Sequence, residues 1–113
     1  MSRTVSALIT TTAGVTLALT LGTAPALAAD GAAVYTAQKC SMCHAIAGKG
    51  NKANPLDGVG AKLSAADTKA WIVTPVEMTA KAKSTKKPPM PAKYGKLPAA
   101  DIDALVEYLQ SLK

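Results

Sequence analysis

The sequence is poor in the residues that most often build metal and catalytic sites. Its 113 residues include one histidine and two cysteines, no phenylalanine, one tryptophan and three tyrosines. Tetrahedral zinc needs four ligands, so the lack of a second Cys/His pair argues against a zinc site. Arginine occurs once, at position 3. The chain therefore offers few side chains for acid–base catalysis on a bound substrate.

The scarce histidine and cysteines all fall in one pentapeptide, Cys-Ser-Met-Cys-His at residues 40–44. Cys-x-x-Cys-His is the attachment motif of c-type haem, in which the thiols add to the vinyl groups and the imidazole binds the iron. On a helical turn, side chains three apart project from one face. The motif therefore predicts one haem c held covalently by Cys40 and Cys43, with His44 as an axial ligand of its iron.

Three other interpretations of the cysteine pair stay open at this point. A thioredoxin-like redox site is expected within a strand-helix-strand pattern, and no such pattern is visible. Half of a zinc site would lack its remaining ligands. A structural disulfide is common in exported proteins.

Residues 1–28 have the pattern of a cleavable export signal. Arg3 supplies positive charge, residues 5–21 are apolar and uncharged, and a small-x-small cleavage site follows Pro25. The alternative is an uncleaved anchor, but the apolar run is borderline for a bilayer, which needs about 20 residues. We expect cleavage after position 28 or 29, export to the periplasm and no stable membrane insertion afterwards.

Residues 29–113 are expected to form one small domain. A chain of this size with so few aromatics buries little apolar surface by itself. A covalently attached porphyrin would complete the core, as metals and disulfides do in other small domains. We therefore expect the haem-free protein to be poorly folded.

Helix signals appear early and in the middle of this domain. A helix over residues 31–40 is expected after Asp30, a suitable N-cap. A second helix begins at residues 64–67, Ser-Ala-Ala-Asp, which resemble a capping box with aspartate in place of glutamate. It is expected to end near Val73, because the residue before Pro75 is pushed out of the helical region.

A third helix is expected from Pro98, which suits a first helical turn. Its apolar residues recur at helical spacing and form one stripe: Ile102, Leu105, Val106, Leu109 and Leu112. Glycine and proline interrupt residues 48–60 and 86–98, which are expected to be loops. With no alternating strand pattern, the predicted fold class is all-α.

The second axial ligand of the iron would come from a methionine. Met42 lies inside the attachment motif, on the same side as His44, and Met78 lies in a short segment of undecided structure. Met90 lies in Pro-Pro-Met-Pro, where three prolines restrict the backbone and remove competing donors. A loop of that kind can hold a weak thioether ligand, so Met90 is the predicted ligand. The alternative for any methionine is a flexible residue that fills a gap in the core.

Residues 30–113 resemble the class I c-type cytochromes, and in particular small soluble monohaem carriers of bacteria. Besides the haem motif, the chain has a Gly-x-x-x-aromatic pattern at Gly31 and Tyr35 and a Leu-x-x-Tyr pattern at Leu105 and Tyr108. In that family these patterns lie where the first and last helices cross. The resemblance implies the cytochrome c fold, three main helices plus loops around one haem.

The resemblance also implies three neighbours of the haem. Pro55 would offer its carbonyl to the free ring nitrogen of His44, which would orient the ring and raise its basicity. Trp71 would reach a haem propionate, although it is equally suited to be a half-buried helix residue. Tyr94 would close the ligand loop against the haem.

The expected function is a periplasmic one-electron carrier that is not an enzyme. The alternatives are a haem subunit of a larger oxidase or dehydrogenase, and an open-site haem enzyme or gas sensor in which Met90 does not bind the iron. Six lysines lie within residues 81–96, where they would face an acidic redox partner or merely solvate a loop. The export signal, and the lack of aromatics among the lysines, argue against a nucleic-acid partner.

Overall fold

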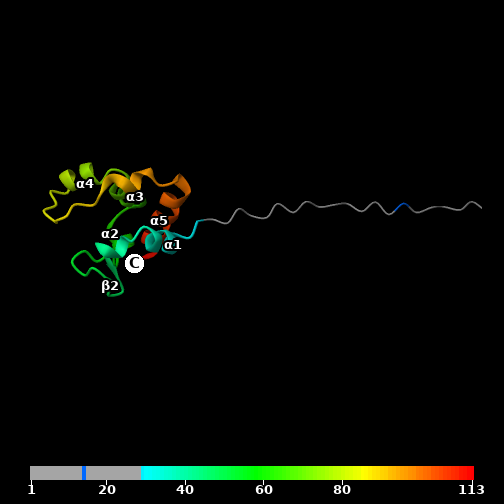
Figure 1. Ribbon diagram of the computed structural model, residues 1–113, viewed down its shortest axis with the longest axis horizontal. Coiled ribbons are helices and arrows are strands. Elements are labelled where there is room, and N and C mark those ends of the chain that lie inside the picture. The colour runs from blue at the N-terminus through cyan, green and yellow to red at the C-terminus, as the bar shows by residue number, and fades with distance from the viewer. Residues whose placement is uncertain (1–13, 15–28) are drawn as a thin grey trace, which may run out of the picture.

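The computed structural model describes Gly14 and residues 29–113, so the predicted signal, Gly14 apart, lies outside the described residues. The described chain is mostly helical, which confirms the predicted all-α class (Figure 1). The elements are α1 (Gly31–Ala37), η1 (Cys40–Met42), β1 (Ala45–Ile46), β2 (Lys49–Gly50), α2 (Val59–Lys62), α3 (Ala65–Val73), α4 (Pro75–Lys81), η2 (Ala92–Lys96) and α5 (Ala99–Ser111), where η marks a 3₁₀ turn.

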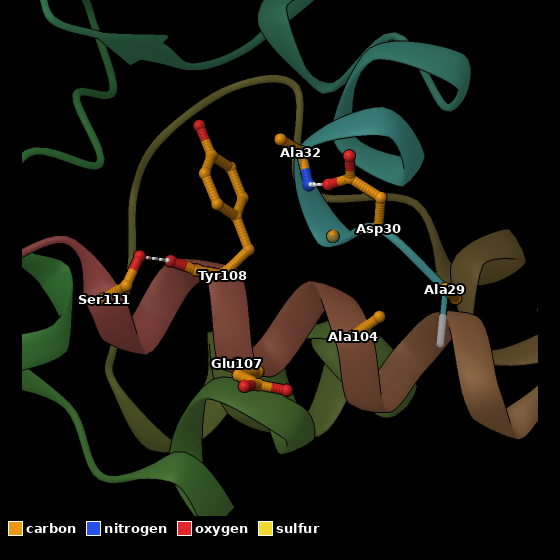
Figure 2. Close-up of a pocket in the computed structure, with 8 residues that line it drawn as sticks. Ala29, Asp30, Ala32, Ala104, Glu107, Tyr108 and Ser111 are labelled. Atoms are coloured by element: carbon orange, nitrogen blue, oxygen red, sulfur yellow. Dashed lines mark hydrogen bonds between the residues drawn. The ribbon is translucent and has the colours of Figure 1, made fainter. Parts of the chain in front are cut away.

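Helix α1 begins where the sequence predicts but ends three residues early. The Asp30 side chain accepts hydrogen bonds from the backbone N–H groups of Ala32 (3.0 Å) and Ala33 (3.4 Å), the first of which is drawn in Figure 2. The helix ends at Ala37 because Lys39 adopts a left-handed conformation (φ 55°). Cys40 therefore opens a separate 3₁₀ turn and does not continue the helix.

Helix α3 matches its prediction at both ends. The Ser64 hydroxyl accepts from the N–H of Asp67 at 3.0 Å, and the helix ends at Val73. Pro75 then starts a further helix, α4, since proline has no N–H to lose at a first helical position. The sequence alone does not predict the structure of this segment.

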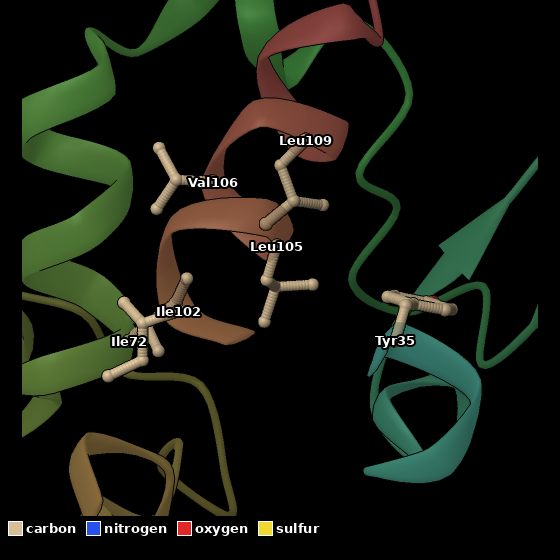
Figure 3. Packing of buried hydrophobic residues seen from close by; sticks show 6 residues of the cluster. All are labelled: Tyr35, Ile72, Ile102, Leu105, Val106 and Leu109. Atoms are coloured by element: carbon tan, nitrogen blue, oxygen red, sulfur yellow. The ribbon is translucent and has the colours of Figure 1, made fainter. Parts of the chain in front are cut away.

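Helix α5 is the centre of the core and lies between α3 and α1, as Figure 3 shows. Its predicted apolar stripe is buried except at Leu112, which is half-buried near the C-terminal end. The buried hydrophobic cluster joins these three helices: Tyr35, Ile72, Ile102, Leu105, Val106 and Leu109.

Helices α1 and α5 cross at Gly31. A Cβ atom at this position would collide with the carbonyl of Ala104 and approach Cβ of Tyr108 to 2.5 Å, so only glycine permits this separation. The rings of Tyr35 and Tyr108 meet edge to face beside the crossing, with centroids 6.0 Å apart. The Gly-x-x-x-aromatic and Leu-x-x-Tyr patterns thus lie at the crossing of the first and last helices, as the family resemblance implies.

The two predicted loops contain short ordered elements. Strands β1 and β2 pair antiparallel just after the cysteine motif, and α2 follows. These strands were not predicted, since two-residue strands are too short for an alternating pattern. Residues 86–98 contain no α-helix, as predicted, but η2 packs its Gly95 against Val73 at the end of α3.

Candidate functional site

The 3₁₀ turn η1 gathers the residues of the pentapeptide. The carbonyl of Cys40 accepts hydrogen bonds from the N–H groups of both Cys43 (3.1 Å) and His44 (3.0 Å). Cys40 is half-buried and packs against the core cluster, whereas Cys43 is exposed. Both cysteines are free thiols in the structure. This turn therefore presents two thiols and one imidazole from five consecutive residues.

The ring of His44 is oriented by one backbone carbonyl. Its Nδ1 lies 3.1 Å from the carbonyl oxygen of Asn54. Because a carbonyl can only accept, Nδ1 carries the proton and Nε2 keeps its lone pair. Burial lowers the pKa of His44, the Asn54 contact opposes this, and the nearby charge of Lys86 lowers the pKa further. The imidazole is therefore neutral at pH 7, the form that binds a metal.

The expected acceptor for this ring was the carbonyl of Pro55, and the structure corrects it by one residue. Pro55 instead forms a parallel bridge with Ala45, in which Leu56 N–H donates to the carbonyl of Ala45 at 2.8 Å. The preceding carbonyl, that of Asn54, accepts from Ala45 N–H (3.3 Å) and from the His44 ring. The register of this bridge, which the sequence alone does not specify, selects Asn54.

Gly50 and Asn51 also restrain the backbone of His44, a role that no sequence motif indicates. Gly50 has φ 107°, and a Cβ atom there would collide with the carbonyl of His44 and lie 2.9 Å from that of Ser41. Asn51 N–H donates to the carbonyls of both Ser41 and His44 at 3.0 Å, and its side-chain amide donates to the carbonyl of Met42 at 3.3 Å. The only sequence signal was a glycine within an expected loop.

The three methionines of residues 29–113 differ in their surroundings. Met42 is 71 % exposed, and Met78 is half-buried on α4. Met90 is half-buried and packs against the core cluster, as does Cys40. Of these three, Met90 is therefore the one that packs on the core cluster.

The other two predicted haem neighbours lie on separate elements. Tyr94 belongs to η2, is half-buried and packs against the core cluster, with Nζ of Lys93 at 5.1 Å from its ring centroid. Trp71 is a half-buried residue of α3 beside the buried Ile72. Tyr94 thus packs on the core cluster, as Met90 and Cys40 also do, whereas Trp71 is a half-buried helix residue.

The donor set fits a haem better than a bare metal ion. Within residues 29–113, no group of three or more His, Cys, Asp and Glu side chains could hold an ion. What the site offers is two free thiols, one imidazole with an available Nε2 and a thioether on the core. These are the donors that covalent attachment and axial ligation of haem use. Among the described residues, helix α1 precedes the motif and the two-residue strands β1 and β2 follow it, so the strand-helix-strand pattern of a thioredoxin-like site is absent.

A comparison with protein families agrees with this geometry. The family model described as Cytochrome c matches residues 28–113. No curated protein and no solved structure matches the chain. The matched range covers the whole helical domain, including η1, the Met90 loop and the α1–α5 crossing. The chain therefore belongs to the cytochrome c family, has its all-helical fold, and carries a covalently bound haem c that serves electron transfer.

Proposed function

We propose that this protein is a periplasmic one-electron carrier whose haem iron is bound by His44 and Met90. The hydrogen bond from His44 Nδ1 to the carbonyl of Asn54 is the observation that carries the proposal, because it leaves Nε2 with a free lone pair for the iron. Met90 supports it as the one of the three methionines in residues 29–113 that packs on the core cluster, against which Cys40 also packs.

The haem, when bound, supplies an iron that changes its charge by one electron. The protein's residues keep the geometry constant during that change. Asn54 orients the imidazole of His44, and the prolines at 88, 89 and 91 limit the backbone around Met90. A thioether ligand and an apolar setting favour the ferrous state and raise the reduction potential. If His44 and Met90 both hold the iron, no substrate would need to bind.

We propose that the protein carries electrons and does not catalyse a reaction. Members of this family are typically electron carriers. Among the described residues, no helix has the length and apolar character that crossing a membrane requires. The export pattern of residues 1–28 is what supports a periplasmic location.

The lysines of residues 81–96 are the proposed docking charges for an acidic redox partner. We call these residues the lysine segment, and all six of its lysines are exposed: Lys81, Lys83, Lys86, Lys87, Lys93 and Lys96. Tyr94 and Met90 lie in the same segment and pack on the core, so the segment that carries the proposed haem ligand also carries this positive charge. Complementary charge of this kind speeds encounter and favours brief binding.

Visible spectra of the haem-loaded protein test this proposal. A sharp low-spin spectrum on reduction, a sulfur-to-iron charge-transfer band on oxidation and no change with carbon monoxide are expected. A high-spin spectrum that shifts with carbon monoxide would indicate an open iron position and would favour a haem enzyme or gas sensor instead.

A further inference from the structure

The loop that carries Met90 has few hydrogen bonds of its own. Before it, Ser84 N–H donates to the carbonyl of Thr79 at the end of α4 (3.0 Å). After it, η2 packs on α3. Within the described part of the chain, the hydrogen bonds of residues 85–90 are two, and Lys86 makes both.

Lys86 connects this loop to a segment 33 residues earlier in the chain. Its Nζ donates to the carbonyl of Ala53 at 2.8 Å, a length typical of a charge-assisted hydrogen bond. Its own N–H donates to the hydroxyl of Ser84 at 3.4 Å, which restrains the turn before it. Lys86 therefore differs from its neighbour Lys87 in making these two hydrogen bonds, although both lysines are exposed and carry the same charge.

The carbonyl that Lys86 binds is next to the carbonyl that orients His44. Ala53 accepts from Lys86, and Asn54 accepts from the His44 ring at 3.1 Å. Asn51 stiffens this short segment, since its side-chain oxygen accepts from Ala53 N–H at 3.0 Å and its carbonyl accepts from Asn54 N–H at 3.4 Å. Two consecutive carbonyls thus contact the loop of one proposed axial ligand and the ring of the other.

We propose that Lys86 is a positioning residue that fastens the Met90 loop to the His44-orienting segment and so keeps Met90 on the iron. This inference rests on the proposed His44/Met90 ligation. For an added ligand to replace Met90, the loop must move outward, and the Lys86–Ala53 hydrogen bond must then break. Removing that bond would lower the free energy of loop opening and leave the rest of the fold unchanged.

Imidazole binding to the oxidised haem-loaded protein measures this opening directly, through loss of the sulfur-to-iron charge-transfer band. The variants are Lys86→Gln, Lys86→Arg and, as a control for charge, Lys87→Gln. Loss of one charge-assisted hydrogen bond at an exposed position is expected to raise the imidazole affinity about fivefold in Lys86→Gln. Lys86→Arg retains a donor and is expected to stay near wild type, as is Lys87→Gln.

Further measurements distinguish a wrong positioning role for Lys86 from a wrong assignment of the iron ligands. Without imidazole, oxidised Lys86→Gln and Lys87→Gln are both expected to keep the wild-type charge-transfer band, which would show that the fold around the haem is intact in both variants. If the wild-type band is present and Lys86→Gln binds imidazole no more tightly than Lys87→Gln, the positioning role is wrong and the ligation stands. If the oxidised wild-type protein has no such band, the ligation is wrong and the positioning role falls with it.

Discussion

At the scale of single residues, backbone carbonyls and not side chains orient the key groups. Asn54 and Ala53 act through their carbonyls, so their side-chain identity carries little information about this role. The residues with reactive side chains, Cys40, Cys43 and His44, could be identified from the sequence because their spacing is itself the signal. The carbonyl acceptor was placed one residue too late because it depends on strand register.

Tyr35 is the residue for which the structure makes the sharpest pH prediction. Its hydroxyl is buried and has no hydrogen-bond partner among the described residues, and burial raises its pKa above the ordinary value of 10.0. An unpaired buried hydroxyl costs stability, so Tyr35→Phe is expected to raise the free energy of unfolding by about 1 kcal/mol at pH 7.

The same residue should also weaken the fold in alkali. Because the folded state keeps the Tyr35 proton longer than the unfolded state does, wild-type stability falls as the pH rises above about 10. Tyr35→Phe is expected to lack this part of the loss, while Tyr108→Phe serves as the control. Denaturant unfolding at pH 7 and pH 10.5 measures both effects, and equal alkaline losses in wild type and Tyr35→Phe would contradict them.

At the scale of elements, the long periodic helix was the easiest to predict and the short pieces were the hardest. The stripe of α5 and the Ser64 cap of α3 are local patterns, and both match the structure. The end of α1 depends on the left-handed backbone conformation of Lys39, which a lysine at this position does not predict. Strands β1 and β2 depend on residues 41–54 folding back onto the haem motif, which is a tertiary effect.

At the α1–α5 crossing, helix propensity and close packing predict opposite signs for the change in unfolding free energy of Gly31→Ala. Helix propensity alone favours alanine over glycine by about 1 kcal/mol. At Gly31, however, the added methyl group collides with the carbonyl of Ala104. Gly31→Ala is therefore expected to destabilise the haem-loaded protein by about 2 kcal/mol in denaturant unfolding. Ala33→Gly, at an exposed site in the same helix, calibrates the propensity effect, and a stabilised Gly31→Ala protein would refute the close crossing.

At the scale of the whole molecule, a small helical domain presents an uneven charge distribution. The chain has a formal net charge of +6, and half of its 12 lysines belong to the lysine segment. The sequence predicted that clustering, while the contacts of Met90 and Tyr94 with the core relate it to the proposed haem ligand. The clustering along the chain alone does not show which side of the domain the lysines occupy.

Electron transfer to ferricyanide, a small anionic oxidant, tests this arrangement without a natural partner. Lys83→Glu is expected to lower the second-order rate constant severalfold at low ionic strength, because it replaces attraction with repulsion near the proposed electron-transfer side. Lys62→Glu, on α2 and outside the lysine segment, makes the same change in net charge. The difference between the two variants should vanish at high salt. Equal rates at low salt would remove the case for local docking charges.

The central claim is that His44 and Met90 together hold the iron, and one pair of variants tests it most directly. The sulfur-to-iron charge-transfer band of the oxidised protein is expected to disappear in Met90→Ala and to persist in Met78→Ala, whose methionine is half-buried on α4. Met90→Ala is also expected to bind carbon monoxide when reduced. A band that survives in Met90→Ala would contradict the ligation on which the proposed electron carrier rests.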